Sequence, residues 1–123
     1  MSHSFVWVDI PATDLDRAIA FYAAVLGSAV TKEGGPGNMF GLFPHSGDDV
    51  AGCVYVAGAD NPPSRTGPLI YLNAEGRLDK AVQAVAEHGG QVLQAPEQIG
   101  PHGWRARVID SEGNRIALHS PTA

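Results

Sequence analysis

The side chains that most often bind metals or transfer protons are few in this chain and widely spaced. Its 123 residues contain five histidines, and these lack the paired spacing of zinc motifs: His3, His45, His88, His102 and His119. A divalent ion with an open catalytic position needs about three donors held rigidly by the protein. We therefore expect no metal cofactor, and the alternative is a divalent metal held by Asp9, His102 and His119.

Two side chains are the candidates for acid and base catalysis. His119 carries an imidazole, which titrates near neutral pH and serves as a general acid or base, unless it is only a surface group at the end of a strand. Asp9 could accept a hydrogen bond or act as a base, or it could form a structural ion pair with Arg115 or another arginine. We keep Asp9 and His119 as catalytic candidates with both interpretations open.

An irregular segment, Gly100-Pro-His-Gly-Trp104, offers a polar and an aromatic group in His102 and Trp104. Loops held by a rigid scaffold often carry binding groups, so both are candidate ligand-binding residues, although the segment could be a purely structural turn. Cys53 lies in an apolar run, where a cysteine is usually a small buried side chain rather than a nucleophile.

The elements that position these residues are repeated. Leu15-Asp16-Arg17-Ala18-Ile19 recurs as Leu78-Asp79-Lys80-Ala81-Val82, and the same offset carries Gly27 onto Gly90. Repeated units usually cannot bury their apolar faces alone, so they pack together and a site between them is expected. We predict a single domain over residues 1–123, with one unit at 4–58, a linker at 59–67 and the second unit at 68–121.

Each unit has the order strand, helix and three strands. Phe5–Ile10 alternates as a half-buried strand that Pro11 ends, and Thr13 and Asp16 form an imperfect capping box before a helix from about Asp14 to Leu26. Gly27 is the expected left-handed stop of that helix. The remaining strands are expected at 29–32, 39–43 and 50–57, then at 69–73, 91–94, 104–109 and 115–119, and the second helix runs from Leu78 to the stop at Gly89 and Gly90.

Composition narrows the class of partner. A formal charge of −5 with only eight lysines and arginines argues against nucleic acid. The apolar runs are far shorter than the roughly 20 residues that cross a bilayer, which argues against a membrane partner. One cysteine cannot form an internal disulfide, so a reducing cytoplasm is the expected location. The expected partners are a small molecule and a second copy of the chain.

The sequence resembles the vicinal oxygen chelate superfamily, which includes glyoxalases, bleomycin-binding proteins and extradiol dioxygenases. The resemblance rests on Asp14-Leu-Asp-Arg-Ala-Ile-Ala-Phe-Tyr22 with Val25-Leu-Gly27, and on Gly89-Gly90 with Asp110-Ser-Glu-Gly-Asn114. It implies an α+β fold in which two tandem βαβββ modules curl a mixed sheet around a cleft, with the helices on the outer face. It also implies a homodimer, whose cleft is built in some relatives from modules of two chains.

The metal ligands of that superfamily are missing here. The resemblance places one ligand at the position of Trp7 and another at that of Ala117, and neither side chain can coordinate a metal. The strand at 69–73 offers Tyr71 and Asn73 but no histidine, and the strand at 50–57 has no glutamate. The resemblance therefore also favours a member without the usual metal site.

Strand alternation indicates what lines the cleft instead. If Val6, Val8 and Ile10 pack under the helix, then Trp7 and Asp9 face the cleft. The same reasoning directs Tyr71 and Asn73, and then Arg115, Ala117 and His119, to the cleft. Trp7 could simply fill space rather than stack on a ligand, and Tyr71 and Asn73 could be half-exposed strand residues.

The first functional hypothesis is a glyoxalase-like protein that binds a small organic molecule in an aromatic-lined cleft without the usual metal. Its expected binding residues are Trp7, Asp9, Tyr71, Asn73, His102, Trp104 and His119. The alternative is a metal-dependent lyase, isomerase or dioxygenase with a rebuilt site, and a third hypothesis is an assembly module. Whether any reaction is catalysed is left open, and so is the identity of the ligand.

Overall fold

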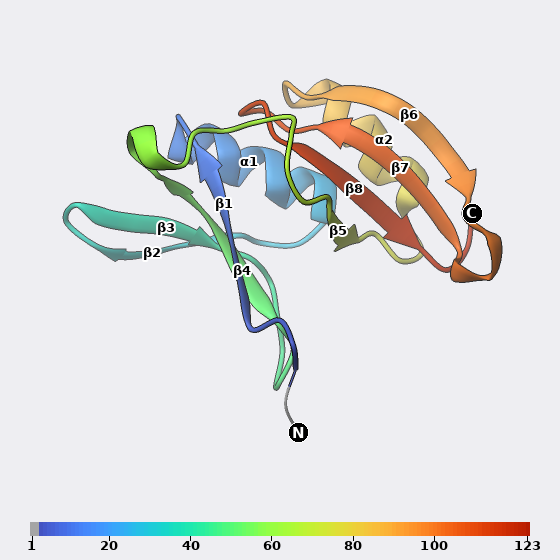
Figure 1. Ribbon diagram of the computed structural model, residues 1–123, viewed down its shortest axis with the longest axis horizontal. Coiled ribbons are helices and arrows are strands. Elements are labelled where there is room, and N and C mark those ends of the chain that lie inside the picture. The colour runs from blue at the N-terminus through green and yellow to red at the C-terminus, as the bar shows by residue number, and fades with distance from the viewer. Residues whose placement is uncertain (1–2) are drawn as a thin grey trace.

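The computed structural model of the protein describes residues 3–123 and shows an α+β fold with two helices and two four-stranded mixed sheets (Figure 1). The first half contains β1 (Trp7–Ala12), α1 (Leu15–Leu26), β2 (Thr31–Gly35), β3 (Asn38–Leu42) and β4 (Ala51–Val56). The second half contains β5 (Ile70–Asn73), α2 (Leu78–Glu87), β6 (Gln91–Gln98), β7 (Trp104–Ile109) and β8 (Arg115–Ser120).

The two halves have the same topology. The strand order is β1-β4-β3-β2 in one sheet and β5-β8-β7-β6 in the other, which we call sheet A and sheet B. In each, the first strand pairs in parallel with the last one, and the other neighbours are antiparallel. The α+β class and the tandem βαβββ modules are confirmed, and the strands form two separate sheets.

Pro11 does not end the first strand, contrary to the sequence-based expectation. It lies within β1, opposite Tyr55 of β4. Proline is tolerated there because β1 is an edge strand, so the missing N–H would otherwise face away from the sheet. The strand is therefore Trp7–Ala12, which leaves Phe5 and Val6 outside it.

The capping box predicted at Thr13 is also wrong. Asp14 is the N-cap of α1, and its side chain accepts a hydrogen bond from the backbone N–H of Arg17 at 3.1 Å. The C-terminal prediction is confirmed, since Gly27 is left-handed with φ 68°. Its repeat partner Gly90 has a different role, because a Cβ there would lie 2.5 Å from the Ile109 carbonyl oxygen and 2.7 Å from Phe21.

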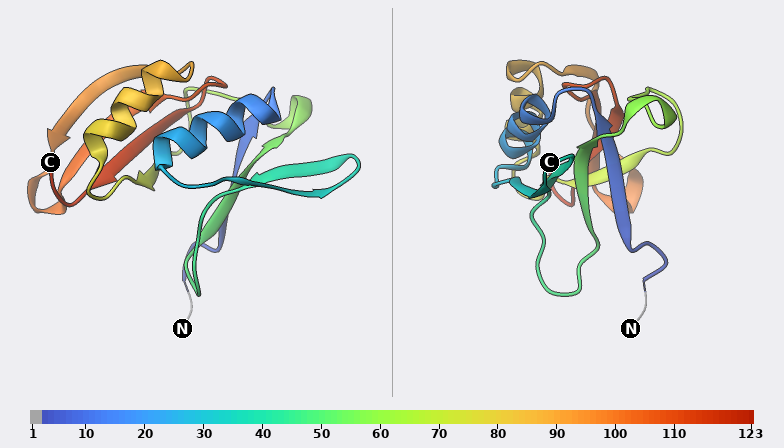
Figure 2. Two further views of the ribbon diagram at one scale, coloured as in Figure 1. Left: turned by 180° about the vertical axis from the view of Figure 1, so that it is seen from behind. Right: turned by 90° about the vertical axis from the view of Figure 1, so that its left-hand side faces the viewer.

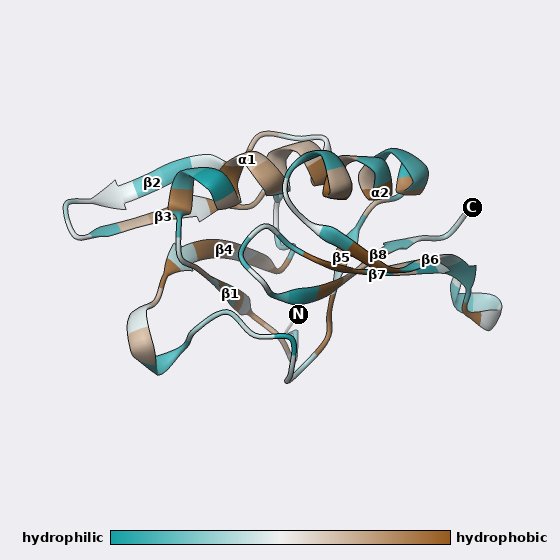
Figure 3. Cartoon of the chain, turned by 90° about the horizontal axis from the view of Figure 1, so that it is seen from above, coloured by the Kyte–Doolittle hydropathy of each residue, from teal (hydrophilic) through white to brown (hydrophobic). Residues whose placement is uncertain are grey.

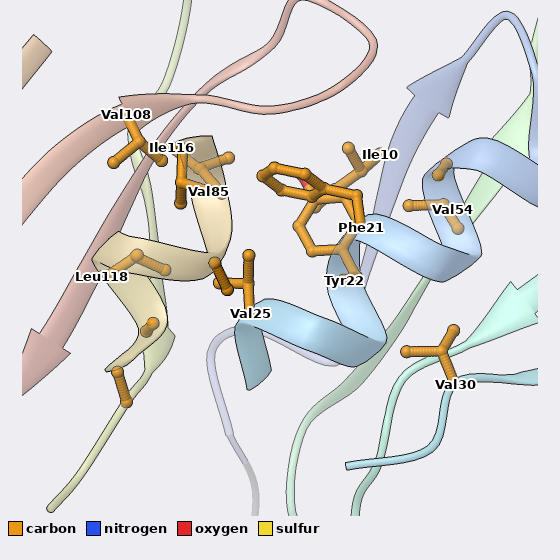
Figure 4. Close-up of a cluster of buried hydrophobic side chains, with 14 of the residues drawn as sticks. Ile10, Phe21, Tyr22, Val25, Val30, Val54, Val85, Val108, Ile116 and Leu118 are labelled. Atoms are coloured by element: carbon orange, nitrogen blue, oxygen red, sulfur yellow. The ribbon is translucent and has the colours of Figure 1, made fainter. Parts of the chain in front are cut away.

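Helices α1 and α2 lie side by side on one side of the two sheets (Figure 2). One hydrophobic core joins both halves, with Phe21, Tyr22 and Val25 of α1 packing in the same cluster as Val85 and Leu118 (Figure 4). Both helices carry apolar as well as polar residues (Figure 3), as expected for elements that cover a core with one face. Neither module therefore encloses a complete core of its own.

Both ends of α1 are bound by side chains of the second half. At its N-terminus, Glu112 accepts hydrogen bonds from the backbone N–H groups of Thr13 and Asp14, each at 2.9 Å. At its C-terminus, Arg77 donates to the Val25 carbonyl oxygen. A carboxylate at the N-terminus and a guanidinium at the C-terminus both complement the helix dipole, so the two halves are joined by charge as well as by apolar packing.

Within residues 3–123, neither helix is long and apolar enough to cross a bilayer.

Candidate functional site

An open hollow of about 370 Å³ lies on the face of sheet A that is turned away from the helices. We call it the sheet A hollow, and its lining combines aromatic, carboxylate and thiol groups: Trp7, Asp9, Gly37, Asn38, Met39, Phe40, Cys53, Tyr55 and Val56. Trp7, Phe40 and Tyr55 share this face by strand alternation, and Trp7 is 44% exposed. Exposed apolar side chains gathered in a concavity are typical of a binding surface.

Trp7 is held in place from within the hollow. Its indole N–H donates to the Asp9 carboxylate at 2.6 Å, and the Cys53 thiol donates to the same oxygen at 3.3 Å. Alternation places Trp7 and Asp9 on the side opposite Ile10, which is buried in the core. The predicted facing of Trp7 and Asp9 is thus found, and Asp9 orients the indole ring.

Cys53 is not a nucleophile in this environment. Burial, followed by the hydrogen bond and the negative charge of Asp9, raises the pKa of the Cys53 thiol to about 12. The thiol therefore stays protonated near neutral pH, and only a thiolate reacts readily.

A second cluster of polar residues lies on the outward face of sheet B. Arg105 donates to the Tyr71 hydroxyl at 2.7 Å and to Glu97 at 3.2 Å. The rings of Tyr71 and His119 meet edge to face with their centroids 6.5 Å apart. His119 is held by a 2.6 Å contact between Nε2 and the His102 carbonyl oxygen, so that nitrogen carries the proton.

The sequence-predicted site residues therefore fall into two groups. Trp7 and Asp9 line the sheet A hollow, and no residue of sheet B lines it. Tyr71 and His119 belong to the second cluster, and the Asn73 side chain accepts the Glu75 backbone N–H at 2.9 Å. Asp9 and His119, the candidate acid and base, thus lie on different sheets.

Trp104 does not face the cleft, contrary to the expectation. It packs against the hydrophobic core on the helix side, like Ala106 and Val108. His102 lies in a short 3-10 turn, Gly100–His102, with its side chain exposed, and it contributes its backbone carbonyl to His119. The strand expected at 104–109 is confirmed as β7, and Trp104 is its first residue and follows its alternation.

Arg105 and Arg107 were missed by the sequence reasoning. Since Ala106 and Val108 are buried in the core, the alternating residues Arg105 and Arg107 face the other side of sheet B. The signal was present in the sequence, because the alternation of charged and apolar residues from 104 to 109 is the pattern of a strand with one polar face.

A second concavity, of about 400 Å³, separates the two sheets along β1, β4 and β5. Its walls are mainly aliphatic, and its few polar groups include Tyr71 and Asn73. A smaller one of about 120 Å³ has Asp9 and Arg115 in its lining. The two do not form the ion pair considered for them, since the Arg115 guanidinium donates to the Gly67 carbonyl oxygen at 2.9 Å.

The donor side chains do not fit a metal ion. Among residues 3–123, no three histidine, cysteine, aspartate or glutamate side chains come together as a ligand set. Asp9 contacts Trp7 and Cys53 on sheet A, whereas His119 lies on sheet B, so the alternative set of Asp9, His102 and His119 is not assembled.

Comparison with known proteins identifies the family. Residues 4–118 match the model of the glyoxalase/bleomycin resistance protein/dioxygenase superfamily, to which this chain belongs. A glyoxylase-like domain-containing protein of Didymella fabae is 30% identical over 115 residues, which cover 90% of this chain and 88% of that protein.

Solved structures share the fold over nearly the whole chain. A glyoxalase/bleomycin resistance protein from Albidiferax ferrireducens T118 aligns with a TM-score of 0.74 and 19% identity, covering 96% of this chain and 98% of that one. An antibiotic binding protein from Streptomyces sp. CB03234 aligns with a TM-score of 0.69 and 25% identity, covering 98% of each chain. At 19% identity, the likeness to the Albidiferax protein is evidence for the fold alone.

Proposed function

We propose that this protein binds a small organic molecule with an aromatic or polycyclic part in the sheet A hollow, without a metal. The observation that carries the proposal is the exposed indole of Trp7, held by Asp9 in a concavity with Phe40 and Tyr55. The Streptomyces antibiotic binding protein of the same fold supports a binding role of this kind.

The chemistry of the lining favours an aromatic ligand. A ring stacked on Trp7 gains dispersion and quadrupole interactions beyond its area of burial. Because the indole N–H is already satisfied by Asp9, the ligand need supply no acceptor to it.

We also propose that a second copy of the chain completes the site. The sheet A hollow is open to solvent, and the polar cluster of sheet B does not cover it within one chain. At the N-terminal end of β1, Phe5 and Val6 are 76% and 77% exposed, and Val50 beside them is 40% exposed. This apolar end projects from the rest of the molecule (Figure 1), as expected for a surface that a partner covers.

Replacing Trp7 by alanine is expected to weaken the binding of a neutral probe, 2-naphthamide, at least tenfold, because the stacking surface is lost. The probe is titrated calorimetrically into both proteins. A tenfold loss corresponds to about 1.4 kcal/mol of binding free energy.

The matched control is Leu93→Ala, which removes a comparably exposed apolar side chain (43%) from sheet B. In a Trp104→Phe protein, Trp7 is the only tryptophan, so quenching of its fluorescence by the probe reports on the hollow directly. Binding that is unchanged by Trp7→Ala, or that leaves Trp7 fluorescence unaltered, would place the site elsewhere.

Replacing Val6 by glutamate is expected to convert a dimer into a monomer, because a charge would be buried in the proposed contact. Light scattering coupled to gel filtration would show twice the chain mass of 12.9 kDa for the unmodified protein and a single chain mass for the variant. Leu93→Glu, at an exposed position of β6, should leave the mass unchanged. A monomeric unmodified protein would contradict the shared site.

A further inference from the structure

The outward face of sheet B carries Arg105 and Arg107, although the chain as a whole has a net charge of −5. The strand register places side chains there in two rows across β5, β8 and β7. One row is Tyr71, Ala117 and Arg107, and the neighbouring row is Asn73, His119 and Arg105. We call these two rows the arginine face.

The two arginines differ in how their charge is balanced. Arg105 is paired with the carboxylate of Glu97 at 3.2 Å. Arg107 donates through Nε to the neutral amide oxygen of Gln94 at 2.6 Å, and no carboxylate pairs with it among residues 3–123. The terminal nitrogens of Arg107 therefore carry a charge that nothing in the described chain neutralises.

The arrangement around Arg107 suits a planar anion. Arg107 of β7 lies opposite Ala117 of β8, which in turn lies opposite Tyr71 of β5. Because Ala117 is small and uncharged, no acidic side chain stands between Arg107 and Tyr71 in this row. The Tyr71 hydroxyl accepts from Arg105 and keeps its own proton free to donate. Donors thus surround this place, and the fixed fork of a guanidinium matches a carboxylate with two parallel hydrogen bonds.

We propose that the arginine face binds a carboxylate on the ligand, so that the natural ligand is an aromatic carboxylic acid rather than a neutral aromatic molecule. Arg107 is the primary partner of the carboxylate, and Arg105 and Tyr71 are the secondary partners. The inference rests on the proposed function, because the aromatic part of the same molecule lies in the sheet A hollow. In the proposed dimer the hollow and the arginine face come from different chains.

The test compares matched acid and amide probes by calorimetric titration of the full chain: 2-naphthoate with 2-naphthamide, and anthraquinone-2-carboxylate with its amide. We expect each acid to bind at least tenfold more tightly than its amide. Arg107→Gln should abolish this preference, and Arg107→Lys should restore part of it. Because exposed charges are screened by salt, the preference should also shrink as sodium chloride is raised.

The control variant is Arg65→Gln, which removes the same charge from the exposed linker. It should keep the acid preference, and circular dichroism would confirm that every variant is folded. Equal binding of acid and amide, or an acid preference that survives Arg107→Gln, would overturn the inference and leave the proposed function standing. If none of the four probes binds, or if Trp7→Ala leaves the binding of all four unchanged, the proposed function is overturned and the inference with it.

Discussion

Replacement of Asp110 by alanine is expected to lower the free energy of unfolding by about 3–5 kcal/mol, because it strands several buried donors at once. Asp110 is 2% exposed, and its carboxylate accepts the Tyr22 hydroxyl at 2.5 Å and the backbone N–H groups of Glu112 and Asn114 at 2.8 and 2.9 Å. The Asn114 amide donates to it as well, at 3.0 Å. Urea unfolding followed by circular dichroism measures the loss.

The partner of Asp110 allows the cause to be separated from a general loss of packing. Tyr22 is fully buried, and burial, followed by the charge and hydrogen bond of Asp110, raises the pKa of its hydroxyl. Tyr22→Phe removes the donor that Asp110→Ala would strand, so the double variant should be less destabilised than the sum of the two single ones. Asp48→Ala, at an exposed position, is the control and should change stability little. Additive effects at Tyr22 and Asp110 would contradict this account.

Glu112→Gln is expected to destabilise the protein by on the order of 2 kcal/mol near neutral pH, with a loss that fades in acid. Burial alone would raise the pKa of Glu112, but hydrogen bonds from Arg17, Asp14, Ser111 and Thr13 outweigh it and lower the pKa to about 2. The folded state therefore favours the carboxylate. Its contribution is complete above the unfolded value of 4.5 and is lost as the pH falls from there toward 2.

The measurement is the free energy of unfolding of both proteins at several pH values between 6 and 3, from urea titrations. The curves should converge as the pH falls, because protonation of Glu112 removes the same interactions as the substitution. Glu75→Gln, at an exposed carboxylate on the turn after β5, should follow the unmodified protein throughout. A difference between Glu112→Gln and the unmodified protein that is constant across this range would show that the ionised carboxylate is not what stabilises α1.

The elements of the fold were predictable because they depend on local patterns. The repeated segments at 15–19 and 78–82 both begin helices in the structure, at Leu15 and Leu78. Alternation also assigned the faces of Trp7 and Asp9, since a strand places successive side chains on opposite sides. The same alternation over 104–109 places Trp104 on the core side of sheet B and Arg105 and Arg107 on its outward face, so Trp104 does not line the predicted site.

The contacts that join the halves were not predictable from such patterns. Glu112 lies 99 residues from Thr13, and Arg77 lies 52 residues from Val25. No spacing in the sequence indicates which charged residue of one module will meet the helix ends of the other. The division of the predicted site between two sheets has the same origin, because it depends on how the modules pack and not on the strands themselves.

The contacts at the two ends of α1 bear on how the repeat arose by duplication and on how the chain unfolds. A single copy of the repeat would lose the carboxylate and the guanidinium that satisfy both ends of this helix, and it would expose Phe21, Tyr22 and Val25 to water. The unit that was duplicated is therefore smaller than the unit that now folds. We expect the chain to unfold in one cooperative step, and a cut within the linker at 59–67 to yield two fragments that are stable only together.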